Sequence, residues 1–271
     1  MLSKLRLSSK LTLGGIALMS LAIFFWPFLI AAAQTNQAAL AQTVFLVLMP
    51  ALLLLGFLEI NDGELDSRRL ATLSVLVACN SAIRLLGAGV SGVETVFFLI
   101  VLGGYVFGPS FGFLLGSLSL FASALLAAGI GPWLPFQMMA AALVGLVAGC
   151  LAPVAGIIHA RFRSAKAVRA IEVGILACYS VVASFAYGAL MTMWTWPFLA
   201  SVGSLVSYRP GAPIVENLAR FIKYELLTGG LAWDFGRATT SAALIAMTAP
   251  ALLTTLRRAA NRAGLQTDKF V

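Results

Sequence analysis

The sequence is poor in charge and has almost no histidine. Only 10% of its 271 residues are charged, whereas 61% are hydrophobic, and the mean hydropathy is +0.98. Soluble globular domains carry about 25% charged residues, so this chain has too few charges to cover a water-soluble surface. A single histidine, His159, excludes a His-rich metal site. The composition therefore indicates a membrane protein and excludes soluble enzymes and disordered proteins.

Motifs for nucleotide binding and for catalysis are also missing. The chain contains no G-x-x-x-x-G-K-[ST] and no H-E-x-x-H. Ion-coupled pumps bury carboxylates in mid-membrane, but here the carboxylates next to the apolar runs fall near span ends. We predict no catalytic residues, no metal and no cofactor. If the protein transports something, we expect a partner to supply the driving force.

Uncharged stretches give the number of spans. They cover residues 11–58, 70–83, 95–158, 173–208 and 238–256. A helix needs about 20 residues to cross a bilayer, so 95–158 must fold back, at Gly108-Pro109 and near Gly131-Pro132. We predict an all-α polytopic membrane protein with about eight transmembrane helices, at 11–32, 40–60, 70–87, 93–107, 111–128, 135–157, 171–193 and 237–257.

The distribution of Lys and Arg predicts the orientation, because cytoplasmic loops carry an excess of basic residues. With both termini cytoplasmic in a multi-pass cell membrane protein, the inner set is Lys4, Arg6, Lys10, Arg68, Arg69, Arg161, Arg163, Lys166, Arg169, Arg257, Arg258, Arg262 and Lys269. The outer set is only Arg84, Arg209, Arg220, Lys223 and Arg237.

The longest segment outside the predicted spans runs from about 195 to 236, on the outer side. Its apolar residues repeat at helical spacing opposite Glu216, Arg220 and Lys223, and they are Ile214, Val215, Leu218, Phe221, Ile222 and Leu226. This pattern predicts an amphipathic helix on the outer surface. Two interpretations are equally supported: an interfacial helix that plugs the bundle, and a lid over a ligand cavity.

Residues 70–157 carry three patterns: GGYVFGPSFGFLLGSLS, GIGPWLPFQM, and Ala78-x-x-x-Ala82. Together they resemble the substrate-binding S component of energy-coupling factor (ECF) vitamin transporters. The resemblance implies a six-helix core over 67–271, and leaves 1–66 as an N-terminal accessory transmembrane hairpin. It also implies a transmembrane coupling subunit and two ATPase subunits as partners. In the family, the strip of Ser74, Ala78 and Ala82 docks on the coupling subunit. Gly112 and Gly116, also four apart, favour packing inside the bundle.

The resemblance implies that the protein captures an organic micronutrient outside and delivers it through the coupling subunit. The ligand is of vitamin class, with a cobalamin-like molecule as one candidate. Arg84 lies near the outer end of its helix, where it can pair with an anionic ligand, pair with Glu94 or snorkel to the interface. The complete set of candidate substrate-binding residues is Asn80, Arg84, Glu94, Trp133, Gln137, Tyr187, Trp233 and Asp234.

Two other functions stay open. An integral-membrane enzyme acting on lipids would have its site near Glu216, Asp234 and Arg237. A ligand-free assembly protein would have no pocket, and an Ala78→Leu change would then disturb only its own folding.

Overall fold

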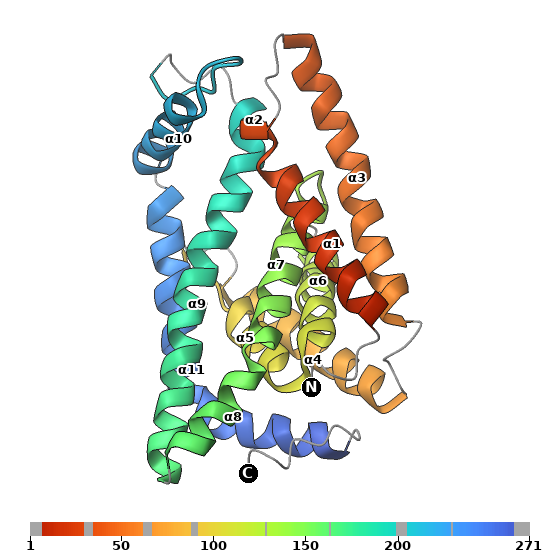
Figure 1. The fold of residues 1–271 in the computed structure, drawn as a ribbon, viewed down its shortest axis with the longest axis vertical. Helices are drawn as coiled ribbons and strands as arrows, with labels where there is room; N and C mark the ends of the chain where they lie inside the picture. The colour runs from red at the N-terminus through yellow and green to blue at the C-terminus, as the bar shows by residue number, and fades with distance from the viewer. Residues whose placement is uncertain are drawn as a thin grey trace.

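The protein is a bundle of α-helices (Figure 1). The computed structural model describes residues 7–29, 35–61, 67–87, 92–127, 129–162, 164–198, 205–228 and 230–262. The helices are α1 Leu7–Phe24, α2 Trp26–Leu29, α3 Thr35–Asn61, α4 Ser67–Gly87, α5 Val96–Phe107, α6 Pro109–Leu126, α7 Leu134–Cys150, α8 Ala152–Arg161, α9 Ala165–Thr195, the 3₁₀ helix η1 Trp196–Phe198, α10 Ile214–Thr228 and α11 Gly230–Arg262. No strand occurs in these ranges, so the predicted all-α class is confirmed.

Among the described residues, five helical segments are long and apolar enough to cross a membrane: Ser67–Gly87, Pro109–Leu126, Leu134–Ile158, Ala165–Phe198 and Gly230–Arg262. Three shorter apolar helical stretches accompany them, at Leu11–Phe24, Leu46–Leu58 and Val96–Phe107. These eight segments correspond to the eight predicted helices. The protein is a multi-pass membrane protein.

Several helix boundaries differ from the prediction, and three of them bear on the site or have a local cause. The helix expected at 135–157 is divided between α7 and α8, because Pro153 in the first turn of α8 has no N–H to continue the α7 hydrogen bonds. Helix α9 begins at Ala165, where the Ser164 side chain accepts a hydrogen bond from the Ala167 N–H. Helix α11 begins at Gly230 instead of 237, so Trp233 and Asp234 lie on a helix and not in a loop.

Helix α5 forms the centre of the bundle. All twelve of its residues are buried, and α4, α6, α7, α9 and α11 pack around it. At 1.5 Å per residue it is about 18 Å long, shorter than the hydrocarbon core of about 30 Å. Because neighbouring helices shield α5 from lipid, its length does not have to equal the thickness of the hydrocarbon core.

Glycines bring α6 and α7 into backbone contact. A Cβ on Gly112 would lie 2.1 Å from the Gly145 carbonyl oxygen, and one on Gly116 would lie 2.2 Å from that of Ala141. Close approach of small residues is the main source of helix association in lipid. The prediction that Gly112 and Gly116 pack inside the bundle is confirmed.

Helices α1 and α3 pack against each other on one side of the bundle (Figure 1), where α3 contacts α7 and α1 contacts α9. Helix α2 continues this side, because Trp26 stacks on Phe198 with ring centres 5.5 Å apart. The Tyr208 hydroxyl also donates to the Pro27 carbonyl at 3.1 Å. The N-terminal helices are therefore joined to the segment that precedes α10.

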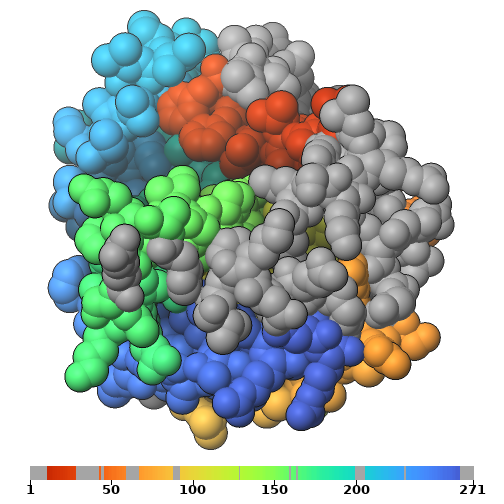
Figure 2. Space-filling model, turned by 60° about the horizontal axis from the view of Figure 1, so that its bottom comes forward, coloured from red at the N-terminus to blue at the C-terminus, as the bar shows by residue number. Residues whose placement is uncertain are grey.

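Basic residues are concentrated at one end of the bundle, which we call the α8 end because α8 lies there. Figure 2 shows it with the last turns of α11 (blue) between α8 (green) and the start of α4 (orange). Arg68 Nη1 donates to the Arg262 carbonyl at 3.3 Å, which joins α4 to α11. Nearby in sequence, Arg257 Nη2 donates to the buried Glu172 carboxylate at 2.7 Å, and the Tyr105 hydroxyl donates to the same oxygen at 2.9 Å. This cluster ties α5, α9 and α11 together.

A candidate ligand site between α4, α6, α7 and α11

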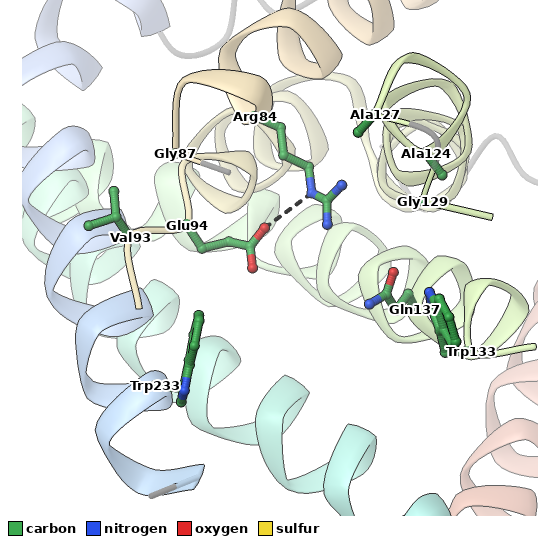
Figure 3. A pocket seen from close by; sticks show the side chains of 10 residues that line it. All are labelled: Arg84, Gly87, Val93, Glu94, Ala124, Ala127, Gly129, Trp133, Gln137 and Trp233. Atoms are coloured by element: carbon green, nitrogen blue, oxygen red, sulfur yellow. Dashed lines mark hydrogen bonds and ion pairs between the residues drawn. The ribbon is translucent and has the colours of Figure 1, made fainter. Parts of the chain in front are cut away.

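A cavity of about 310 Å³ lies between the ends of four helices. Its lining residues are Arg84, Gly87, Val93, Glu94, Ala124, Ala127, Gly129, Trp133, Gln137 and Trp233 (Figure 3). Arg84 is at the opposite end of α4 from Arg68, and Trp233 is at the opposite end of α11 from Arg262. The cavity is therefore remote from the basic α8 end.

The ion pair of Arg84 and Glu94 forms the polar wall of the cavity. Arg84 Nε donates to Glu94 Oε1 at 3.1 Å, and Arg84 Nη1 donates to the Ser123 hydroxyl at 2.9 Å. The two charged side chains are only 23% and 22% exposed. A guanidinium that is partly shielded from water binds an anionic group more strongly than one on the open surface.

Close backbone contacts hold Glu94 in this position. A Cβ on Gly87 would lie 2.7 Å from the Val93 carbonyl oxygen, and the Thr95 hydroxyl donates to the Ile83 carbonyl at 2.8 Å. Gly92 has φ +70°, and a Cβ there would lie 2.9 Å from Gly236 Cα on α11. A side chain at Gly92 would therefore be strained and would also push α11 away.

Behind Glu94, a second arginine extends the charged network into the bundle. Arg237 Nε lies 3.7 Å from Glu94 Oε2, and Arg237 Nη1 donates to Asp234. The Arg237 guanidinium lies 5.0 Å from the centre of the Tyr187 ring, an arrangement in which the ring stabilises the cation. A Cβ on Gly188 would overlap the Asp234 carboxylate. Only a residue without a side chain at position 188 therefore leaves room for this carboxylate.

The structure brings together five of the eight candidate substrate-binding residues: Arg84, Glu94, Trp133, Gln137 and Trp233. Tyr187 and Asp234 are buried and support Arg237 without lining the cavity. Asn80 is fully buried, and neither polar atom of its amide has a hydrogen-bond partner in the described chain. Whether any of these residues binds a ligand stays a prediction.

Sequence reasoning missed Ser123, which orients Arg84, and the small residues Ala124, Ala127 and Gly129, which form a wall of the cavity. Ser119 and Ser123, one turn apart in an apolar helix, were an available signal for a polar face on α6. The small residues carried no such signal, because alanine and glycine are common in every membrane helix.

Helix α10 turns its apolar face away from the bundle. Ile214, Val215, Ile222 and Leu226 are exposed, whereas Asn217, Phe221 and Glu225 are buried. None of the described α10 residues lines the cavity. This arrangement favours the interfacial interpretation of α10, because an exposed apolar face is suited to lipid.

The acidic and basic residues of the lipid-enzyme hypothesis belong to different ion pairs. Glu216 lies on α10 and pairs with Arg209 at 3.2 Å and Arg220 at 2.9 Å. These arginines lower the pKa of the Glu216 carboxyl by hydrogen bonding, the bond from Arg220 first and that from Arg209 second. Asp234 pairs instead with Arg237 inside the bundle. Glu216 and Asp234 therefore belong to two separate ion pairs.

The strip of Ser74, Ala78 and Ala82 is exposed along α4. The Ser74 hydroxyl donates to the Leu70 carbonyl of its own helix at 2.9 Å, so it does not project a free polar group. The strip is thus a smooth outer surface and is not used for packing inside the bundle.

Comparison with known proteins identifies the class. The family described as "ECF transporter, substrate-specific component" matches residues 68–259, which run from α4 to the last turns of α11 and include the cavity. Helices α1 to α3 lie outside the match. No curated protein and no solved structure matches the chain. Because the match covers more than half of the sequence, the chain belongs to the family of substrate-specific components of ECF transporters.

Proposed function

We propose that this protein captures an organic micronutrient of vitamin class on the outer side of the cell membrane and hands it to a coupling subunit driven by two ATPases. The family match over 68–259 carries the proposal. The cavity supports it, because a partly apolar pocket with a few convergent polar groups is the usual form of a small-molecule site.

The proposed docking surface for the coupling subunit is the exposed strip of Ser74, Ala78 and Ala82. Small residues on a membrane helix allow close approach of another helix. An Ala78→Leu variant should fold and bind ligand but lose the coupling subunit. Ala186→Leu is the matched control, because Ala186 is also exposed on a membrane-spanning helix, α9.

The proposed orientation places both termini and the α8 end in the cytoplasm. Arg161, Lys166, Arg169, Arg257 and Arg258 lie on the helices that meet there, in agreement with the excess of basic residues on the cytoplasmic side. The cavity then opens toward the outside. A green fluorescent protein fused to the C-terminus should fluoresce, because it folds in the cytoplasm; a dark fusion would reverse the proposed orientation.

We also propose that 1–66 is an accessory hairpin on a core of 67–271. Helix α3 packs closely on this core, since a Cβ on Gly56 would lie 2.9 Å from the Phe113 ring. The described residues of 1–66 do not line the cavity. Deleting 1–66 should therefore lower stability while leaving ligand affinity within about threefold.

The test is purification from cells in a mild detergent, with a search for bound small molecules by mass spectrometry and for bound proteins by pull-down. A stoichiometric micronutrient together with a coupling subunit and ATPases is the expected result. A preparation with no small molecule and no such partners would overturn the proposal and favour the lipid enzyme or the assembly protein.

A further inference from the structure

The cavity sets the size of its ligand. A volume of about 310 Å³ lies at the small end of ligand pockets, which run from about 300 to 1,000 Å³. It accommodates one ring or two fused rings with a short substituent. A corrinoid macrocycle is several times larger, so the cavity does not suit a cobalamin-like ligand.

Two indole rings set the shape of the ligand. Trp133 at the start of α7 is 45% exposed, and Trp233 in the first turn of α11 is 51% exposed. Both line the cavity (Figure 3), and neither ring stacks on another aromatic ring of the described chain. The Trp133 indole packs on Gly131, and the half of each indole that is exposed favours a flat aromatic partner, which gains dispersion and quadrupole interactions by stacking.

The remaining wall offers hydrogen-bond donors in excess. Arg84 uses Nε for Glu94 and Nη1 for Ser123, and its Nη2 has no partner within the described residues. The Gln137 amide is also without a protein partner there, so it can donate or accept. Glu94 is already shared by Arg84 and Arg237, at 3.1 Å and 3.7 Å. Arg237 is in turn paired with Asp234, so these two arginines and two carboxylates balance in charge. The group with a free donor edge at the cavity is the Arg84 guanidinium.

We infer that the ligand is a small planar aromatic or heteroaromatic acid, with its ring against one of the two indoles and its carboxylate on Arg84. A carboxylate matches the planar donor edge of a guanidinium. The Gln137 amide then forms a hydrogen bond with a ring nitrogen or a carbonyl oxygen of the ligand. This inference rests on the proposed function, because it names the class of molecule that the same site captures.

The test uses acids and their uncharged amides as matched probes, measured by calorimetry on the purified full chain in detergent. The pairs are benzoate and benzamide, pyridine-3-carboxylate and pyridine-3-carboxamide, and quinoline-2-carboxylate and its amide. The acids should bind at least about tenfold more tightly than the amides, since ion-assisted hydrogen bonds are roughly twice as strong as neutral ones. Arg84→Gln should abolish this preference, and Arg84→Lys should keep part of it. Arg209→Gln should keep it fully, because Arg209 is exposed and does not line the cavity.

Small molecules extracted from the same preparation are identified by mass and charge. A flat acid that fits the cavity supports the inference. A neutral, cationic or larger ligand overturns it, as does equal binding of acids and amides, or a preparation that yields no acid and binds none of the probes. Circular dichroism and gel filtration show whether each variant is folded.

The pull-down separates this inference from the proposed function. If the coupling subunit and ATPases are bound but the extracted ligand is neutral, the ligand class is wrong and the importer subunit stands. If an acid binds with the expected arginine dependence but no such partners are recovered, the ligand class stands and the importer assembly is wrong.

Discussion

Replacing one glycine at the α6–α7 contact should destabilise the whole bundle. In Gly112→Ala, the new Cβ would lie 2.1 Å from the Gly145 carbonyl oxygen and 2.5 Å from its carbon, whereas ordinary contact begins at 3.4 Å. The two backbones must therefore separate by about 1.3 Å at this point, because packed interiors contain little free space to absorb the methyl group. Overpacking of this kind costs about 1–3 kcal/mol.

Gly174→Ala is the matched control. Gly174 also lies within a membrane-spanning helix, α9, but a Cβ there would meet no atom within 4 Å. Alanine favours a helix over glycine by up to about 1 kcal/mol, so this variant should be neutral or more stable. The same chemical change thus has opposite expected signs at the two positions.

The assay is the free energy of unfolding in a mixture of mild detergent and SDS, followed by tryptophan fluorescence. Gly112→Ala should also weaken ligand binding, because α6 carries Ser123 and α7 carries Gln137 on the cavity. Equal stabilities of Gly112→Ala and Gly174→Ala, within about 0.5 kcal/mol, would refute the reasoning that α6 and α7 are in backbone contact.

Three further predictions concern buried polar groups. Glu172→Gln should lower the free energy of unfolding by about 3–5 kcal/mol, because it leaves the Arg257 guanidinium without its buried carboxylate. A loss of less than about 1 kcal/mol in an SDS titration would contradict this prediction. Asn80→Leu should raise stability by about 1–3 kcal/mol in the same titration, because it removes a buried amide without partners in the described chain, and a loss would show that the amide has a partner. Burial raises the pKa of Glu225 above 4.5, so its neutral form is favoured in the folded state and stability should fall as pH rises above about 4.5. Thermal unfolding of Glu225→Gln should match the wild type well below pH 4.5 and exceed it at pH 7, and identical profiles would contradict the raised pKa.

The membrane class and the approximate spans followed from the sequence alone. Their signals are local, since an apolar run of about 20 residues has few alternatives to a helix across the bilayer. The fold-back at Gly108-Pro109 was visible for the same reason: Gly108 adopts φ +101° and Pro109 starts α6. The family could also be read from residues 70–157, and the match over 68–259 confirms it.

Helix ends at the membrane surface were less accessible to prediction. Charged residues in the first turns of α9 and α11 marked the end of an apolar run, but they did not mark the end of a helix. Asp234 and Arg237 satisfy each other within the first turns of α11, so the helix continues through them.

The site itself was decided by tertiary structure. The sequence supplied Arg84, Glu94, Trp133, Gln137 and Trp233 as separate candidates, and the bundle brings them to one cavity. It also separates them from Asn80, Tyr187 and Asp234, which had similar sequence signals but are buried away from its lining. The physical reason is that helical periodicity fixes which residues share a face, whereas the rotation and depth of each helix depend on backbone contacts such as those of Gly92 and Gly112 with other helices. Sequence determined the kind of protein and the residues available for binding, and packing determined which of them meet.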